Sequence, residues 1–299
     1  MRWRKEAVAS LAVITAGVMW GIWWLPLRIL AGEGLAGVWP VLLIYTVSAL
    51  ILLPTALLRL RRMLSGGYGS LIVGICVGTA LTLWSYAIIA GPIVPVNMLY
   101  YLGPIWATLL SILWLGERAS RFRALSIPLG LAGAAIILHV DSTIPFPRTL
   151  PEWAGLSAGI IFAIGITYQR LRPELSVHDR TFISYSWSTL IGLLLMPFVA
   201  SPLPASFVTA PIILTTVVAA ALMAVPSYFL LFWGSRYLDS GRVNLLLIVE
   251  GVVSAASASL ITDEPFGWHE AIGCVLVIGA VGVEGLAQLV EVRLARARA

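Results

Sequence analysis

Apolar segments of about 20 residues, the length that crosses a hydrocarbon core about 30 Å thick, recur along the whole chain. The connections between them are short and leave no room for a soluble domain. Only 11% of the 299 residues are charged, compared with about 25% in a typical soluble domain. The sequence therefore predicts an all-α membrane protein with ten transmembrane helices. The expected helices are 6–29, 38–58, 69–90, 94–115, 124–140, 152–171, 180–199, 210–235, 243–261 and 269–290.

The basic residues predict the orientation of these helices. With the N-terminus in the cytoplasm, all but two of the 19 lysine and arginine residues fall on the cytoplasmic side, and the exceptions are Arg28 and Arg148. This asymmetry follows the positive-inside rule and predicts a multi-pass protein with both termini cytoplasmic. Because the basic residues are spread between apolar segments and form no single patch, no nucleic-acid partner is expected.

The two halves of the chain resemble each other. A Val-Asn-x-Leu motif at residues 96–99 recurs at 243–246, and at the same offset Glu117 corresponds to Glu264. Glu117 falls in an arginine-rich inner loop and Glu264 in an outer loop, so we expect two five-helix repeats inserted in opposite orientations. Secondary transporters often have such inverted repeats and hold the substrate between them near the membrane midplane. The expected repeats are residues 1–148 and 149–299.

Two segments carry a resemblance to a known family. Residues 16–21 read Ala-Gly-Val-Met-Trp-Gly, and residues 100–117 contain Pro104 and end in Leu-Gly-Glu. On these motifs the chain resembles the ten-helix, EamA-type branch of the drug/metabolite transporter superfamily. The second half departs from the pattern, because Gly251 replaces the proline and residues 262–264 read Thr-Asp-Glu.

The 12 tryptophans and nine tyrosines make the chain most similar, within this superfamily, to the YddG-type exporters of aromatic amino acids. The resemblance implies a bacterial inner-membrane exporter of small neutral or zwitterionic solutes, with aromatic and other apolar amino acids first. No cofactor or metal is implied. The sequence itself disfavours a phosphorylated solute, because Arg28 is the only cation expected at membrane depth away from the cytoplasmic side.

Other functions stay open as alternatives. Export of other metabolites or drugs would fit the same superfamily, whereas a membrane-embedded enzyme or a channel would belong to a different class. Enzyme chemistry is not predicted, because the sequence has no HExxH motif and Lys5, its only lysine, cannot form a phosphate-binding loop.

The predicted fourth helix carries a polar stripe. Asn97, Tyr101, Pro104, Thr108 and Ser111 recur at spacings of three and four, which places them on one helix face. In a membrane such a face lines a cavity or makes hydrogen bonds to neighbouring helices, and both interpretations remain open.

Glu250 is the only acid predicted to lie well inside the hydrocarbon, roughly 12 Å along its helix from Arg242. A charge at this depth is costly, which favours a functional role such as binding a substrate ammonium or a coupling proton. The alternative is a neutral glutamate hydrogen-bonded to another helix. Ser254 and Ser257 share its face and form a second polar stripe.

Small-residue motifs and deep aromatic residues complete the expectations. Gly-x-x-x-Gly motifs at 74–78 and 155–159 would permit close helix contacts, although chance could also produce them in a glycine-rich chain. Deep tryptophans are suited either to packing or to stacking on an aromatic substrate. The candidate substrate-binding residues are Trp20, Trp24, Trp84, Asn97, Tyr101, Pro104, Trp187, Asn244, Glu250 and Ser254.

Overall fold

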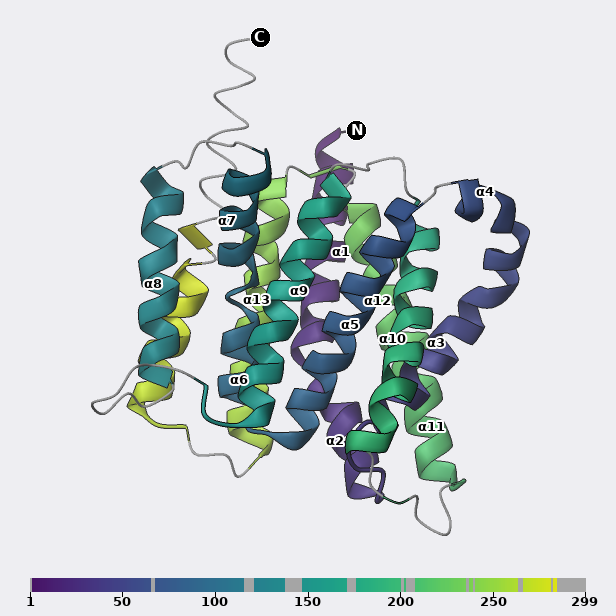
Figure 1. The fold of residues 1–299 in the computed structure, drawn as a ribbon. Helices are drawn as coiled ribbons and strands as arrows, with labels where there is room; N and C mark the ends of the chain where they lie inside the picture. The colour runs from purple at the N-terminus through teal and green to yellow at the C-terminus, as the bar shows by residue number, and fades with distance from the viewer. Residues whose placement is uncertain are drawn as a thin grey trace.

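The protein forms a bundle of helices packed side by side, as the computed structural model shows (Figure 1). In chain order the helices are α1 (Arg2–Gly21), α2 (Trp24–Gly32), α3 (Trp39–Leu58), α4 (Leu60–Ser65), α5 (Tyr68–Ala90), α6 (Ile93–Tyr100), α7 (Gly103–Leu115), α8 (Arg121–Ile137), α9 (Leu150–Arg170), α10 (Val177–Val199), α11 (Ala210–Val218), η1 (Ala219–Ala224), α12 (Val225–Gly234) and α13 (Ser240–Ile261), followed by an apolar helix at Trp268–Ala280. The structure describes residues 2–65, 68–115, 121–137, 147–170, 176–199, 202, 208–234, 237–238, 240–262, 266–280 and 282–283. Within these ranges no strand occurs, so the all-helical fold is confirmed there.

Seven segments of the described chain are long and apolar enough to cross a membrane. The predicted ranges 124–140, 243–261 and 269–290 are not among these seven. Within the last two, the apolar helices are shorter, at Val249–Ile261 and Trp268–Ala280. The ranges 124–140 and 269–290 extend beyond the described residues. The count of ten spans therefore stays a prediction. The seven spans are Lys5–Gly32, Trp39–Leu58, Leu71–Ala90, Ile93–Trp114, Leu150–Tyr168, Val177–Val199 and Ala210–Leu231.

Three helices that the sequence predicts as continuous are interrupted in the structure. The range 6–29 is divided between α1 and α2, 94–115 is divided between α6 and α7, and 210–235 contains the π-helix η1. Proline has no amide hydrogen to donate to the carbonyl group four residues earlier, so it weakens the helix at that point. Ile22 and Leu222 lie within two of these interruptions, and Tyr100 lies directly before the third. Each is four residues before a proline, namely Pro26, Pro226 and Pro104 respectively.

Helices of the first half of the chain pack against helices of the second half. Helix α5 contacts α9 and α10, α1 contacts α12 and α13, and α3 contacts α10. Figure 1 shows α5 beside α9 and α10 in the middle of the bundle. The largest cluster of buried apolar residues spans both halves and includes side chains of α2, α3, α5, α9, α10 and α13. The halves therefore share one core.

Both glycine motifs lie in close helix contacts. A Cβ atom added at Gly159 would lie 2.7 Å from the carbonyl oxygen of Tyr100, and one at Gly78 would lie 2.6 Å from that of Ser184. The interpretation as helix contacts is confirmed for both motifs, because a side chain at either position would force the helices apart.

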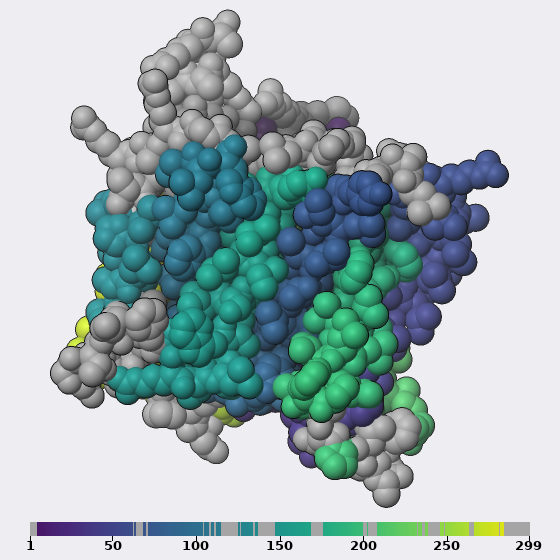
Figure 2. All heavy atoms as spheres, viewed as in Figure 1, coloured from purple at the N-terminus to yellow at the C-terminus, as the bar shows by residue number. Residues whose placement is uncertain are grey.

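The outer surface of the bundle is apolar. Figure 2 shows the face formed by α7, α9, α5 and α10, which lie side by side. A soluble monomer rarely exposes large contiguous apolar areas, whereas a surface of this kind is suited to lipid. Strongly exposed apolar side chains on different helices include Leu58, Leu113, Phe198, Leu260 and Val275.

Candidate solute-binding cavity

A small cavity lies inside the bundle, where the interrupted helices meet. Its walls come from α1, α3, α5, α6, α9, α10, α12 and α13 and from the turns beside them, so both halves contribute. Eight of its lining residues are aromatic, and among the described lining residues the only carboxylic acid is Glu250. The lining residues are Trp20, Trp23, Tyr45, Leu81, Trp84, Tyr100, Phe162, Tyr185, Ala224, Tyr228 and Glu250.

Five of these aromatic residues form one continuous series of ring contacts. Trp23 stacks on Tyr45 with ring centroids 5.9 Å apart, and Tyr45 stacks on Tyr185 at 5.5 Å. Tyr185 meets Tyr228 edge-on at 5.8 Å, and Tyr228 meets Trp20 edge-on at 5.3 Å. Stacked and edge-on geometries are the arrangements that aromatic rings prefer, so this wall is well packed without a ligand.

A second aromatic group forms around Tyr100, the last residue of α6. Its ring stacks on Trp84 of α5 at 5.2 Å and lies 5.9 Å from the ring of Phe162 in α9. The interruption after Tyr100 turns the next residue, Tyr101, so that its ring is tilted by 58° to that of Tyr100. The helix break thus brings two adjacent tyrosines to the same region.

Most polar atoms of the aromatic lining residues are hydrogen-bonded to other protein groups. Because a buried indole N–H or hydroxyl group normally finds a partner, such bonds fix the orientation of each ring. Four of these donors bind oxygen atoms of the protein: Trp20 Nε1 to Ser227 Oγ at 2.9 Å, Trp23 Nε1 to Ser85 Oγ at 3.3 Å, Trp84 Nε1 to Asn97 Oδ1 at 2.8 Å and the Tyr185 hydroxyl to the Ala224 carbonyl oxygen at 2.7 Å.

The π-helix η1 has a direct part in this arrangement. Its last residue, Ala224, accepts hydrogen bonds through its carbonyl oxygen from the Tyr185 hydroxyl and from Ser227 Oγ at 3.0 Å. A π-helical turn interrupts the regular bonding of an α-helix and often occurs at functional sites. Here the interruption supplies an acceptor that holds one wall of the cavity.

Glu250 differs from the two other buried acids of the described chain. Asp179 binds Arg59, and Glu270 accepts the backbone N–H of Gly267 at 2.8 Å. Glu250 is 7% exposed, and the hydroxyl of Tyr101 lies near its carboxyl group without meeting the geometry of a hydrogen bond. No cation pairs with Glu250 within the described residues. Its carboxyl group therefore faces the cavity without a counter-charge.

Asn97 connects the helices behind the cavity. Its side chain accepts from Trp84 of α5 and donates through Nδ2 to Ser254 Oγ of α13 at 2.5 Å. Asn97 is 2% exposed and Ser254 1%, so this chain of bonds is shielded from water and lipid. It joins the two polar stripes that the sequence predicts on the fourth and ninth helices.

The structure brings most of the predicted site residues into one region. Trp20, Trp84 and Glu250 line the cavity, and Asn97 and Ser254 lie directly behind it. Tyr101 lies beside Glu250. The remaining four do not line the cavity or cannot be placed: Trp24 donates to Ser257 at 2.9 Å, Trp187 packs against Gly74 and Gly78, and the side chains of Pro104 and Asn244 lie outside the described part of the structure.

Sequence reasoning missed several tyrosines and a phenylalanine that line the cavity. Tyr45, for example, interrupts an apolar run in α3, which is the signal that could have identified it. Any aromatic residue in the middle of an expected helix carries the same signal. The missed aromatic lining residues are Tyr45, Phe162, Tyr185 and Tyr228.

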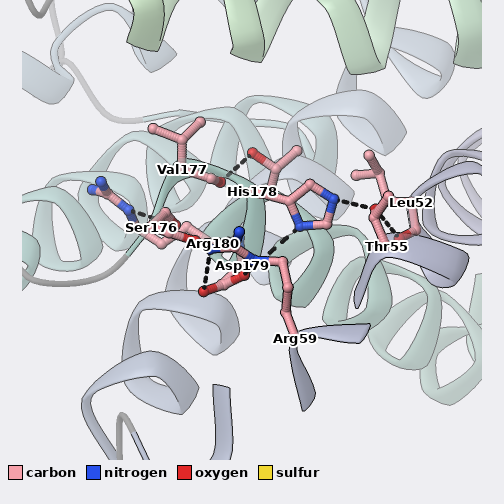
Figure 3. A network of polar contacts seen from close by, with 9 residues as sticks. Leu52, Thr55, Arg59, Ser176, Val177, His178, Asp179 and Arg180 are labelled. Atoms are coloured by element: carbon pink, nitrogen blue, oxygen red, sulfur yellow. Dashed lines mark hydrogen bonds and ion pairs between the residues drawn. The ribbon is translucent and has the colours of Figure 1, made fainter. Parts of the chain in front are cut away.

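A second polar cluster joins α3 to α10 at the end of the bundle where α1 begins (Figure 3). Arg59 donates through Nε to Asp179 Oδ1 at 2.7 Å and through its second nitrogen to Oδ2 at 3.4 Å. This hydrogen bond raises the pKa of the Arg59 guanidinium above its ordinary value. At the start of α10, the backbone N–H of Asp179 donates to Ser176 Oγ at 3.1 Å.

His178 extends this cluster toward α3. Its Nε2 atom forms a hydrogen bond with Thr55 Oγ1, and its Nδ1 atom lies 3.7 Å from Asp179 Oδ1. The cluster therefore holds α3 and α10 together through paired charges and hydrogen bonds. Within the described residues, no group of three or more potential metal ligands occurs here or elsewhere.

Comparison with known proteins agrees with this arrangement. No curated protein matches the sequence at a significant level. One solved structure, described only as the crystal structure of a protein, is 18% identical and has a TM-score of 0.63, covering 96% of this chain and 99% of that chain. At this identity the likeness shows the fold alone. The sequence model of the EamA-like transporter family matches twice, at residues 7–139 and 150–283. Because these matches cover most of the chain, the protein belongs to the EamA-like transporter family and is a multi-pass membrane transporter of small solutes.

Proposed function

We propose that the protein is a secondary transporter that exports small neutral or zwitterionic solutes with an apolar, ring-bearing body by alternating access. Aromatic amino acids are the first candidates. The observation that carries this proposal is the aromatic cavity, which is built from both halves of the chain and has Glu250 as the one acid of its described lining.

The lining of the cavity supports a small ring-bearing solute. Small-molecule sites are usually lined by apolar and aromatic side chains with a few polar groups, and most of the lining residues here are aromatic. Trp84 and Tyr100 both line the cavity and suit contact with a planar solute, and Glu250 suits an ammonium group. A phosphorylated solute would require cations, and none occurs in the described lining.

The transport cycle that we propose uses the two halves, residues 1–148 and 149–299, as inverted five-helix repeats. Rocking of one repeat against the other would expose the cavity to each side of the membrane in turn. We place ten spans in a bacterial inner membrane with both termini in the cytoplasm, as the distribution of basic residues favours.

A counterflow experiment tests the function. Purified full-length protein is reconstituted in liposomes preloaded with unlabelled solute, and the uptake of labelled tryptophan or phenylalanine is measured. We expect saturable, stereoselective uptake that empty liposomes lack. Uptake of a sugar nucleotide without any uptake of aromatic amino acids or related amines would contradict the proposed solute class.

A further inference from the structure

We infer that the cavity recognises the ammonium end of its solute and provides no counterpart for a carboxylate, so that aromatic monocations bind more tightly than the corresponding amino acids. The ligands of this class are aromatic amines and their quaternary ammonium derivatives. This inference rests on the proposed function and refines its solute class.

The first observation is the charge of the lining. Glu250 is the only acid among the described lining residues, and none of them is a lysine or an arginine. Arg28 lies at membrane depth but donates to the backbone carbonyl oxygens of Ile88 at 2.9 Å and Gly91 at 2.5 Å, at the end of α5. Arg59 binds Asp179 at the end of the bundle. A zwitterion in the cavity would therefore find a partner for its ammonium group only.

The second observation is the direction of the polar donors. An uncompensated carboxylate can be stabilised in a buried site by several N–H or O–H groups. In this cavity the indole N–H groups of Trp20, Trp23 and Trp84 and the hydroxyl of Tyr185 already donate to protein oxygens. A carboxylate entering the cavity would therefore lose its water without gaining these four donors. The remaining hydroxyl groups of the described lining, those of Tyr45, Tyr100 and Tyr228, carry no positive charge to offset that loss.

The third observation is the arrangement of rings around the acid. The face of an aromatic ring attracts a cation within about 6 Å of its centroid, and quaternary ammonium groups are commonly held in cages of such rings. Here Trp20, Tyr100 and Tyr228 line the same cavity as Glu250. A monocation here would be stabilised both by the ring faces, through cation–π attraction, and by the opposite charge of the carboxylate.

The unpaired state of Glu250 points in the same direction. A buried charge without a partner is costly, and the cost is offset when an ion of opposite sign binds beside it. The hydroxyl of Tyr101 approaches Glu250 but carries no charge. A bound cation would supply the counter-charge that the described part of the fold does not.

Binding of four indole compounds to the purified full-length protein tests this inference. Tryptamine carries only the ammonium group, tryptophan carries both charged groups, indolepropionate carries only the carboxylate, and tryptophol carries neither. We expect tryptamine to bind at least about tenfold more tightly than tryptophan, and indolepropionate to bind most weakly. This comparison uses the unaltered protein and so does not depend on the folding of a variant.

Two variants test whether Glu250 causes the preference for tryptamine. Glu250→Gln should remove the preference for tryptamine over tryptophol, whereas Glu33→Gln, at an exposed position beyond α2, should leave it unchanged. Counterflow of permanently charged trimethyltryptamine in liposomes should follow the same pattern, because this compound cannot cross the bilayer as a neutral amine.

The outcomes separate the inference from the proposed function. Equal or tighter binding of tryptophan would overturn the inference while leaving an aromatic-solute transporter in place. A preference for tryptamine that persists in Glu250→Gln would also overturn it, because the acid would not be its source. If none of the four compounds binds and no labelled aromatic solute is transported, the proposed function itself fails.

Discussion

Two buried acids of this protein have opposite surroundings. Asp179, at the start of α10, is bound by Arg59 and has His178 beside it. Glu250, in the middle of α13, faces aromatic rings and has no cation near it in the described chain. A buried acid that is paired within the fold contributes to holding helices together, whereas one that is left unpaired is available to a ligand. The difference separates a structural cluster from a candidate binding site.

The strongest test of this comparison removes the charge of Glu250. Glu250→Gln keeps the shape of the side chain, so we expect the protein to fold with an unchanged or higher melting temperature. Transport should fall about 30-fold or more, because loss of one partner from a buried charge pair costs about 2–5 kcal/mol. Counterflow rates and thermal unfolding of the same preparation measure both effects. Normal transport by Glu250→Gln would make the glutamate structural.

A second change disturbs the backbone beside Glu250 without altering its charge. A Cβ atom at Gly21 would lie 2.8 Å from the Glu250 carbonyl oxygen and 2.8 Å from Val253 Cβ. Gly21→Ala should therefore push α1 and α13 apart, destabilise the protein by about 1–3 kcal/mol and weaken solute binding. Gly32→Ala is the control, because nothing lies within 4 Å of the added atom there. Equal melting temperatures of the two variants would contradict the close contact.

Loss of the charge partner of Asp179 should lower stability more than transport, the opposite of the pattern expected for Glu250→Gln. Arg59→Met removes the partner of Asp179, and we expect a loss of about 1–2 kcal/mol of stability with little change in transport. The value is kept small because the Arg59 side chain is 34% exposed. The double variant Arg59→Met, Asp179→Asn should recover part of the loss, which a thermal unfolding cycle measures. A transport defect as large as that of Glu250→Gln would erase the distinction between the two regions.

The smallest expected effect comes from removing a tyrosine hydroxyl group while keeping its ring. Tyr185→Phe keeps the ring against Tyr45 and Tyr228 but removes the hydrogen bond to the Ala224 carbonyl. We expect a loss of about 1 kcal/mol of stability, and a change in tryptamine affinity below about threefold. Tyr185→Leu, which removes the ring, should weaken binding more. Similar affinities of the two variants would show that the ring does not contribute.

The sequence predicted the helices and the central acid better than the walls of the cavity. Glu250 was identifiable because a charge at membrane depth is costly wherever the helix faces. The orientation of the tryptophans was not identifiable in the same way. Trp20, Trp23 and Trp24 would share a face of a continuous helix, but the interruption at Ile22 turns Trp24 toward Ser257 and leaves Trp23 on the cavity.

Contacts between distant segments could not be predicted from local patterns. Arg59 and Asp179 are 120 residues apart, and neither position shows an unusual pattern in its own helix. Tyr45 and Tyr185 stack only because α3 and α10 pack together. The helix breaks, in contrast, occur beside prolines that are visible in the sequence. The prolines alone do not predict the breaks, because α3, α8 and α10 continue through Pro54, Pro128 and Pro197.

The contact between α1 and α13 bears on how the protein is made. Helix α1 leaves the ribosome first, but its glycine face is completed by Val249 and Val253 near the other end of the chain. At a synthesis rate of about 5–20 residues per second, α1 waits in the bilayer for roughly 10–50 s before this partner arrives. A nascent chain that stops before α13 would present an unfilled groove to lipid, which gives quality-control proteases a feature by which to distinguish incomplete chains from finished ones.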